Sequence, residues 1–392
     1  MSARRALRGT VLSAIAVTVL AACGTTGQPG GGAGGELSGE GTGDSCVINS
    51  PIPVGAALSL TGGAASYGAS QQKGLELAAE QLKQKGGVSY ELKIEDDATD
   101  PRQGITVFEQ LIEQGVSVII GPTLSNGAFQ AQPIAQEEKV PVLGISNTAD
   151  GIVEQGDYVF RDSLPEAAVI PQTVAAAKQK FGLKKVVVMY SNDDAFTESG
   201  YKVFASALEQ EGIEVAETLT FAKADTDFRA LLTQAKGHQP DAIVVSALIE
   251  AAVPLVTQAR QLGIDSPIIG GNGFNNPVLM EQAGKAAEGV VVGAAWNSAS
   301  DNPGNAEFLA AYQQKYQAAP DQFAAQAHAG LMIIDAAVRS SCDGGREGIK
   351  TGLGTIKDLP TALGDVTINA QRDVEHEAVV QIVADGKFAV LK

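Results

Sequence analysis

Short runs rich in valine and isoleucine alternate with helical patterns along most of the chain. In the first series these runs are apolar almost throughout, which is typical of buried parallel strands. We assign them to residues 52–58, 92–95, 116–120 and 141–145. Between them, apolar residues recur on one helical face, as Leu75 and Leu82 do. The repeated unit is βαβ, so the pattern predicts an α/β fold.

A second series of the same kind follows Leu164. Its strands are predicted at residues 186–189, 215–221, 243–246, 268–269 and 290–292. The two series match in layout although their residues differ, which predicts two doubly wound, Rossmann-like lobes. In such sheets ligands bind at the carboxyl ends of the strands, where the strand order reverses. Two lobes that face each other would therefore form one cleft.

The part of the chain after Trp296 has helical patterns but only weak strands, too few to fold alone. The helices are predicted at 305–316 and 323–340, and the strands near 366–368 and 378–383. We expect this part to complete the first lobe and then return to the second. The hinge crossings would lie near Leu164, Trp296 and Ala370. The expected lobes are 46–164 with 297–369, and 165–296 with 370–392.

The first residues have the pattern of an export signal. Arg4, Arg5 and Arg8 precede an apolar run of about 14 residues, which is shorter than the roughly 20 residues that a membrane-spanning helix needs. The run ends in Leu-Ala-Ala before Cys23, which resembles a bacterial lipobox. We expect residues 1–22 to be a signal peptide and Cys23 to carry acyl chains such as palmitate. The alternative is an ordinary signal peptide followed by an incidental cysteine.

Residues 23–45 are rich in Gly, Thr and Ser and have no apolar periodicity. Such a composition predicts a flexible linker. About 350 residues remain for the folded body. This length exceeds that of a usual single core, in agreement with two lobes.

Charge and cysteine content limit the possible partners. Without the three signal arginines, 25 Lys and Arg face 45 Asp and Glu, a formal charge of −20. Nucleic acid and anionic membrane surfaces are therefore poor partners, and the lipid alone would contact a membrane. Cys46 and Cys342 remain, and an exported compartment favours a disulfide between them. The alternative is two buried thiols.

Several motifs resemble the leucine/isoleucine/valine-binding family, the receptors of branched-chain amino acid ABC importers. They lie at residues 58–63, 67–68, 96–101, 118–122, 140–143, 258–263 and 287–289. The resemblance implies a type I periplasmic-binding fold that captures a small amino acid or a related carboxylate or amide. It also implies an ABC permease with separate ATPase subunits as partner, and a place on the outer face of the cytoplasmic membrane.

The resemblance also assigns site residues. A ligand carboxylate would bind Ser125, where a strand end opens into a helix, and Thr148, in the loop after the next strand. The alternative for Ser125 is that it is merely the N-cap of that helix, and both roles can hold at once. Tyr67 and Phe196 would be aromatic walls from opposite lobes. The full set is Ser59, Tyr67, Ser125, Asn126, Ser146, Asn147, Thr148, Phe196, Leu248, Ile249, Glu250 and Asn272.

One position departs from the family pattern. Asn272 stands where amino-acid receptors of this family have an acidic residue for the ligand's ammonium group. A neutral amide supplies no compensating charge, and burial of an unpaired ammonium is costly. Either Glu250, Asp193 or Asp194 supplies the charge, or the ligand is a carboxylic acid, an amide or a urea-like molecule without an ammonium.

An exported enzyme and a ligand sensor are the two other classes of function to which such a chain could belong. An exported enzyme is disfavoured because the three histidines lie far apart and because no nucleophile elbow, P-loop or dinucleotide fingerprint occurs. We therefore expect no catalytic residue, metal or cofactor. A ligand sensor for a separate signalling partner stays open, since the same two lobes could serve it.

Overall fold

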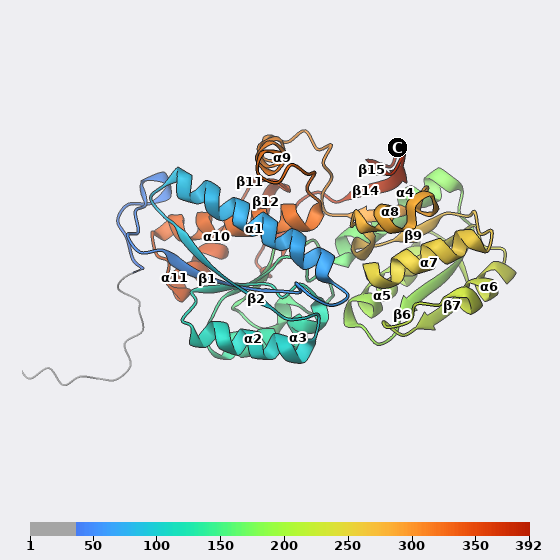
Figure 1. Ribbon diagram of the computed structural model, residues 1–392, viewed down its shortest axis with the longest axis horizontal. Helices are drawn as coiled ribbons and strands as arrows, with labels where there is room; N and C mark the ends of the chain where they lie inside the picture. The colour runs from blue at the N-terminus through green and yellow to red at the C-terminus, as the bar shows by residue number, and fades with distance from the viewer. Residues whose placement is uncertain (1–36) are drawn as a thin grey trace, which may run out of the picture.

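The first strand series forms a parallel five-stranded sheet in the order β2-β1-β3-β4-β5. Its strands are β1 (Ile52–Leu58), β2 (Tyr90–Asp96), β3 (Val118–Ile120), β4 (Val142–Gly144) and β5 (Val159–Arg161). Their connections are α1 (Ala65–Lys85), α2 (Pro101–Glu113), α3 (Ser125–Glu137) and the 3-10 turn η2 (Val153–Gln155). In this computed structural model, which describes residues 37–392, α1 lies on one face of the sheet and α2 and α3 on the other (Figure 1).

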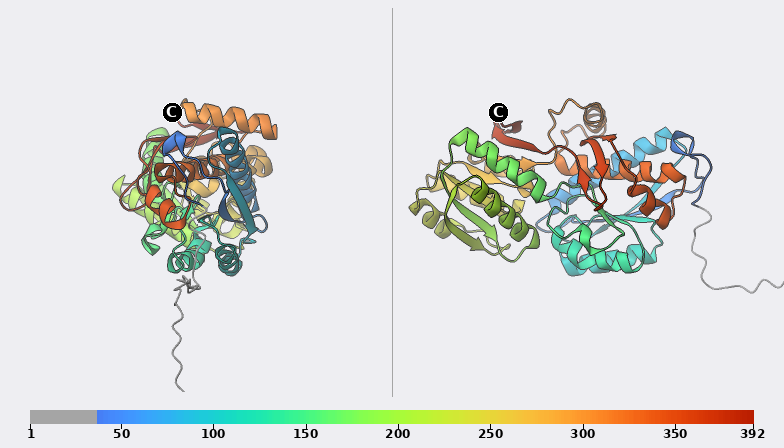
Figure 2. Two further views of the ribbon diagram at one scale, coloured as in Figure 1. Left: turned by 90° about the vertical axis from the view of Figure 1, so that its left-hand side faces the viewer. Right: turned by 180° about the vertical axis from the view of Figure 1, so that it is seen from behind.

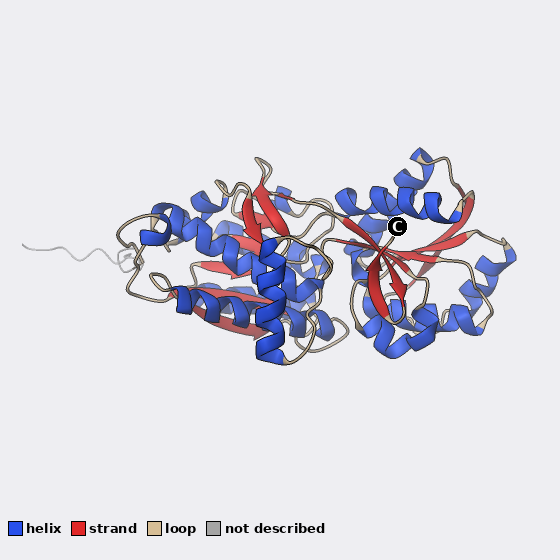
Figure 3. Cartoon of the chain, turned by 90° about the horizontal axis from the view of Figure 1, so that it is seen from above, coloured by secondary structure: helices blue, strands red, loops and turns tan. Residues whose placement is uncertain are grey.

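The second series forms a seven-stranded sheet in the order β15-β14-β10-β9-β8-β6-β7. Five strands are parallel: β6 (Lys185–Ser191), β7 (Glu214–Phe221), β8 (Ala242–Ser246), β9 (Ile268–Gly270) and β10 (Val291–Ala294). Its helices are α4 (Glu166–Phe181), α5 (Ala195–Gln210), α6 (Arg229–Gly237), α7 (Ile249–Gln261) and α8 (Val278–Ala283), with the 3-10 turns η3 (Asn272–Phe274) and η4 (Gly284–Ala287). Figure 3 shows the two sheets as separate groups of strands. The predicted two-lobed α/β fold is confirmed.

The last part of the chain contributes to both lobes (Figure 2). α9 (Pro303–Tyr316), α10 (Gln322–Ser341) and α11 (Arg346–Leu353) join the first lobe, where α10 packs along α1. β11 (Leu359–Thr361), β12 (Gly364–Ile368) and β13 (Val374–Glu375) form a small antiparallel sheet. β14 (Val379–Ala384) and β15 (Lys387–Val390) then add antiparallel strands to the edge of the second sheet.

The third hinge crossing lies later than the position expected near Ala370. Val374 and Glu375 still pair with β12, and Asp373 forms an ion pair with Arg161 of β5 at 2.6 Å. These contacts hold residues 370–375 on the first lobe. The chain therefore crosses between Glu375 and Val379.

The last residues of the linker expected at 23–45 belong to the folded body. Ser38 forms a β-bridge with Asp343, and the Gly39 N–H donates to the Cys342 carbonyl at 2.9 Å. The 3-10 turn η1 (Gly43–Ser45) then leads to Cys46. The prediction of a flexible linker is therefore wrong for residues 37–45, because their backbone pairs with the folded body. The expected signal peptide and Cys23 lie outside the described residues.

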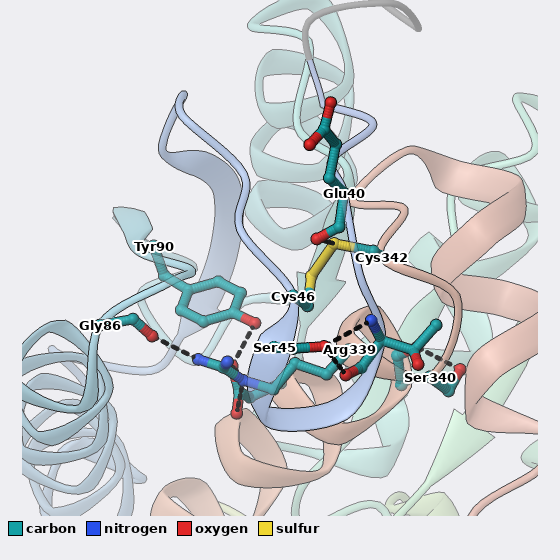
Figure 4. Close-up of a disulfide and its surroundings, with 11 residues drawn as sticks. Glu40, Ser45, Cys46, Gly86, Tyr90, Arg339, Ser340 and Cys342 are labelled. Atoms are coloured by element: carbon teal, nitrogen blue, oxygen red, sulfur yellow. Dashed lines mark hydrogen bonds and ion pairs between the residues drawn. A yellow bond between two sulfur atoms is a disulfide. The ribbon is translucent and has the colours of Figure 1, made fainter.

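Cys46 and Cys342 form a disulfide, the favoured of the two alternatives for these cysteines. The two residues are 296 positions apart, and both are buried. Figure 4 shows the bond beside Arg339, which pairs with Asp335 on α10 and donates to the Gly86 carbonyl at 2.9 Å. The disulfide thus fixes the start of the first lobe to the C-terminal end of α10. Within residues 37–392, no helix is both long and apolar enough to cross a membrane.

Candidate functional site

A small cavity lies between the lobes, at the carboxyl ends of the central strands. Its volume is about 20 Å³, which is room for about one water-sized molecule. The first lobe contributes Tyr67, Thr123, Leu124, Ser125, Ser146, Thr148, Gln322, Phe323 and Gln326, and the second contributes Phe196, Leu248, Asn272 and Gly273. Because both lobes contribute to the wall and the enclosed volume is small, the two lobes are in a closed arrangement.

The N-terminus of α3 points its first residue at this cavity. α3 begins at Ser125, and its N-cap residue is Leu124, whose side chain cannot cap the helix. The reading of Ser125 as only an N-cap is therefore wrong. The first-turn N–H groups of α3 have no side-chain cap, and the helix dipole places partial positive charge there. This end of the cavity is suited to an anionic group such as a carboxylate.

The loop after β4 adds hydroxyl groups. The Ser146 hydroxyl donates to the Thr123 carbonyl at 2.5 Å and accepts from Gln71 Nε2 at 2.7 Å. Thr148 Oγ1 donates to Glu166 Oε1 at 3.1 Å. Both side chains line the cavity, but their hydroxyl protons are already bonded within the protein. A solute would receive from them acceptor capacity rather than a free donor.

Tyr67 connects the two lobes. Its hydroxyl donates to the Gly273 carbonyl at 2.6 Å and accepts from the Ile249 N–H at 2.8 Å. Its ring stacks at a tilt on Phe323, with ring centroids 4.3 Å apart. Tyr67 is 1% exposed, so these bonds are shielded from water. Phe196 and Leu248 form the apolar wall of the second lobe opposite.

Asn272 is backed by a buried carboxyl group that the sequence analysis missed. Asn272 Nδ2 donates to Glu166 Oε1 at 3.0 Å, and its Oδ1 accepts from Gln322 Nε2 at 3.3 Å. Burial raises the pKa of Glu166 to about 7, although the hydrogen bonds from Asn272 and Thr148 favour the charged form. Glu166 Oε2 has no hydrogen-bond partner among the described residues. A carboxyl group thus lies behind Asn272, outside the cavity wall, and not at position 272 itself.

None of the three acids considered as substitutes takes that place. Asp194 Oδ2 accepts from Asn126 Nδ2 at 2.7 Å, outside the cavity. Asp193 accepts from the Ser191 hydroxyl at 2.9 Å, and Glu250 lies against Gly63. The side chains that line the cavity, all within the described part of the chain, include no charged group.

Five of the predicted site residues do not line the cavity: Ser59, Asn126, Asn147, Ile249 and Glu250. The Ser59 hydroxyl donates to Asp97 Oδ1 at 2.6 Å, and Asn147 Nδ2 donates to the Pro122 carbonyl at 2.8 Å. Both side chains hold loops of the first lobe in place. Asn126 instead joins the lobes, because its Oδ1 accepts from the Ala195 N–H of the second lobe at 2.7 Å.

The start of α10 supplies cavity residues that the sequence analysis also missed. Gln322 Oε1 accepts from Asn275 Nδ2 at 2.8 Å and from the Ala295 N–H at 2.7 Å. Phe323 packs on Tyr67, and Gln326 follows one turn later. A signal was present, since two amide side chains four residues apart open a mostly apolar helix. That pattern marks a helix end that faces a polar site.

Comparison with known proteins gives consistent matches over most of the chain. The family model described as "Periplasmic binding protein" matches residues 51–387. The Leu/Ile/Val-binding protein BraC3 of Rhizobium johnstonii is 25% identical over 339 residues, which cover 85% of this chain and 91% of that protein.

Solved structures are also similar to this chain over most of its length. The leucine binding protein LivK of Thermotoga maritima has a TM-score of 0.82 at 25% identity and covers 86% of this chain and 97% of its own. LivJ of Streptococcus pneumoniae in complex with isoleucine has a TM-score of 0.81 at 28% identity, with coverages of 86% and 98%. A benzoate-bound solute binding protein from R. palustris shares the fold, with a TM-score of 0.80 at 24% identity and coverages of 87% and 96%.

Proposed function

Because the chain belongs to the periplasmic binding protein family, we propose that it is the extracytoplasmic receptor of an ABC importer. In this role it captures a small solute between its lobes and delivers it to a permease that works with separate ATPase subunits. The observation that carries the proposal is the cavity walled by both lobes, with Tyr67 bonded across it. Relatives and neighbours named as binding proteins for branched-chain amino acids support the same role.

The solute is proposed to be a small amino acid or a related carboxylate or amide. The uncapped N-terminus of α3, with Ser125 as its first residue, favours a carboxylate. The aromatic and aliphatic side chains of Tyr67, Phe196 and Leu248 favour an apolar body. The hydroxyl oxygens of Ser146 and Thr148 on the cavity wall offer acceptors for the remaining polar groups.

Capture is proposed to proceed by hinge closure. A cavity of about 20 Å³ cannot admit an amino acid, so the solute must enter while the lobes are further apart. It would first contact Ser125 and Thr148 on the first lobe. The second lobe would then close through Phe196, Leu248 and Asn272, because a solute that contacts both lobes shifts the population towards the closed form.

The export signal and lipid on Cys23 complete the proposal. Two or three acyl chains, each contributing about 0.8 kcal/mol per buried CH₂, would anchor the receptor stably. The short linker after Cys23 would keep the lobes near the outer face of the cytoplasmic membrane, beside the permease. Metabolic labelling with a palmitate analogue, in the full chain and in a Cys23→Ala variant, tests this part.

A thermal-shift panel tests the proposed function. Amino acids, aliphatic and aromatic acids, amides and ureas are each added to the purified protein. A true solute at 100 times its Kd stabilises the folded state by about 2.7 kcal/mol, and is recovered unchanged. A panel in which no member raises the unfolding temperature, or one in which the ligand is chemically converted, contradicts a receptor for these solutes.

A further inference from the structure

Gln326 is a cavity residue whose side-chain amide is buried without a partner. It lies on α10, one turn after Gln322, and is 1% exposed. Both Nε2 and Oε1 are buried and form no hydrogen bond within residues 37–392. Buried amides in folded proteins almost always have partners, because an unpaired one loses its bonds to water without replacement.

The other polar side chains on the same wall are already committed. The Tyr67 hydroxyl both donates and accepts across the lobes. Asn272 uses its amide nitrogen on Glu166 and its oxygen on Gln322. The oxygen of Gln322 accepts two further bonds, from Asn275 and from the backbone of Ala295. Gln326 therefore stands apart as a cavity amide with all of its hydrogen-bonding capacity free.

A carboxamide offers two donors and one acceptor but no charge. It matches a neutral group, such as a hydroxyl, a carboxamide or a urea, and it cannot compensate an ammonium or a second carboxylate. No charged side chain joins it on the described cavity wall. The amide of Gln326 therefore differs from the apolar groups that a cavity needs at the point where it contacts an aliphatic side chain of a ligand.

We propose that Gln326 is a specificity-determining residue, and that its amide binds a second, neutral polar group of the solute. The solute class is then a small carboxylate that also carries a hydroxyl, carboxamide or urea group, rather than one with a purely apolar body. The inference rests on the proposed function and narrows it. Its energetic basis is that a buried hydrogen-bonding group discriminates strongly against an analogue that leaves it unpaired.

Matched pairs of solutes test the inference. Succinamate and 4-methylpentanoate have nearly the same shape, as do 4-hydroxybenzoate and 4-methylbenzoate, and only the first of each pair carries the second polar group. Calorimetry should show that the wild-type protein binds the polar member of at least one pair about 10-fold more tightly or better. Gln326→Met, which keeps the length and loses the hydrogen bonds, should remove this preference. Gln314→Met on the exposed side of α9 is the control and should keep it.

Other outcomes overturn the inference. If Gln326→Met weakens both members of a pair equally, the amide binds the carboxylate instead. If the preference survives in Gln326→Met, or if the wild-type protein prefers the apolar members, the residue does not set specificity.

The solute-free protein supplies a second readout that needs no bound ligand. Gln326→Met removes no hydrogen bond to another group of residues 37–392, so the unfolding temperature of the solute-free variant should equal or exceed that of the wild type. A fall of several degrees would mean that the amide is structural and would overturn the inference even if no solute in the pairs binds. Failure of the proposed function looks different, since then the whole solute panel gives no shift.

Discussion

Glu166 is a carboxyl group at which burial outweighs hydrogen bonding. Its ordinary pKa of 4.5 rises to about 7 because the side chain is buried beside Asn272. Between these two pH values the folded protein holds a proton that the unfolded chain has released. The neutral group therefore contributes its full stability below about pH 4.5, and this contribution is lost as the pH rises through about 7.

Replacement of Glu166 by glutamine should remove this pH dependence. A shift of this size corresponds to roughly 3 kcal/mol, so Glu166→Gln should gain about that much unfolding free energy relative to wild type between pH 4 and pH 8. Chemical denaturation of both proteins at a series of pH values measures the difference. Glu109→Gln, at an exposed position on α2, is the control. Parallel pH profiles for wild type and Glu166→Gln would show that the carboxyl group is not protonated near neutral pH.

Sequence reasoning found the part of the cavity that local patterns encode. Ser125, Thr148 and Asn272 follow predicted strands, and the structure places all three on the cavity wall. Sequence reasoning missed Glu166, because its role depends on how α4 packs against the strand ends, which no local pattern records. It also missed Gln326, although the pair of amides at the start of α10 indicates a polar site. Whether Gln326 has a hydrogen-bond partner depends on the packing of α10 and cannot be read from that pair.

At the scale of elements, the side chain of Tyr67 at the start of α1 contacts the start of α7 and the turn η3. The Tyr67 hydroxyl bonds to Ile249 at the start of α7 and to Gly273 in η3. Each partner belongs to the second lobe, whereas Tyr67 belongs to the first. Because these bonds join the two lobes, the proposed opening would break them, and they would stabilise the closed form and not the open one.

Tyr67→Phe should weaken solute binding without unfolding the protein. The change leaves the Gly273 carbonyl and Ile249 N–H unpaired in the closed form, at a cost of about 1–3 kcal/mol, or roughly 5- to 150-fold in Kd. Calorimetry with a solute from the panel measures it. Tyr316→Phe is the matched control, because the Tyr316 hydroxyl donates to the Lys73 carbonyl within the first lobe and does not join the two lobes. Equal affinities for wild type and Tyr67→Phe would show that the bridge does not contribute to closure.

The disulfide acts on a different pair of elements. It fixes the segment before β1 to the end of α10, far along the chain, and neither cysteine lines the cavity. Closure of so long a loop restricts the unfolded chain, which typically stabilises a protein by about 2–4 kcal/mol. The Cys46→Ser/Cys342→Ser double variant should lose about this much unfolding free energy while its solute affinity stays the same. Unchanged stability, or a large loss of affinity, would contradict a purely structural role.

At the scale of the whole molecule, hydrophobic patterning predicted the two-lobed α/β fold and most of its long elements. β1 was predicted at its observed bounds, Ile52–Leu58, because its apolar run is long and uninterrupted. β5, β11, β13 and β15 were missed because two to four residues are too few to show a period. The last crossing was misplaced because the Arg161–Asp373 ion pair, which holds residues 370–375 on the first lobe, joins positions 212 apart.

Solution scattering from the whole protein, with and without a solute identified by the panel, tests the central claim that the lobes close over a solute. The two-lobed architecture predicts a solute-free ensemble that is more extended than the closed arrangement. Saturating solute should reduce the radius of gyration to the value that the closed structure gives. A tightly bound solute that leaves the radius of gyration unchanged would contradict capture by closure.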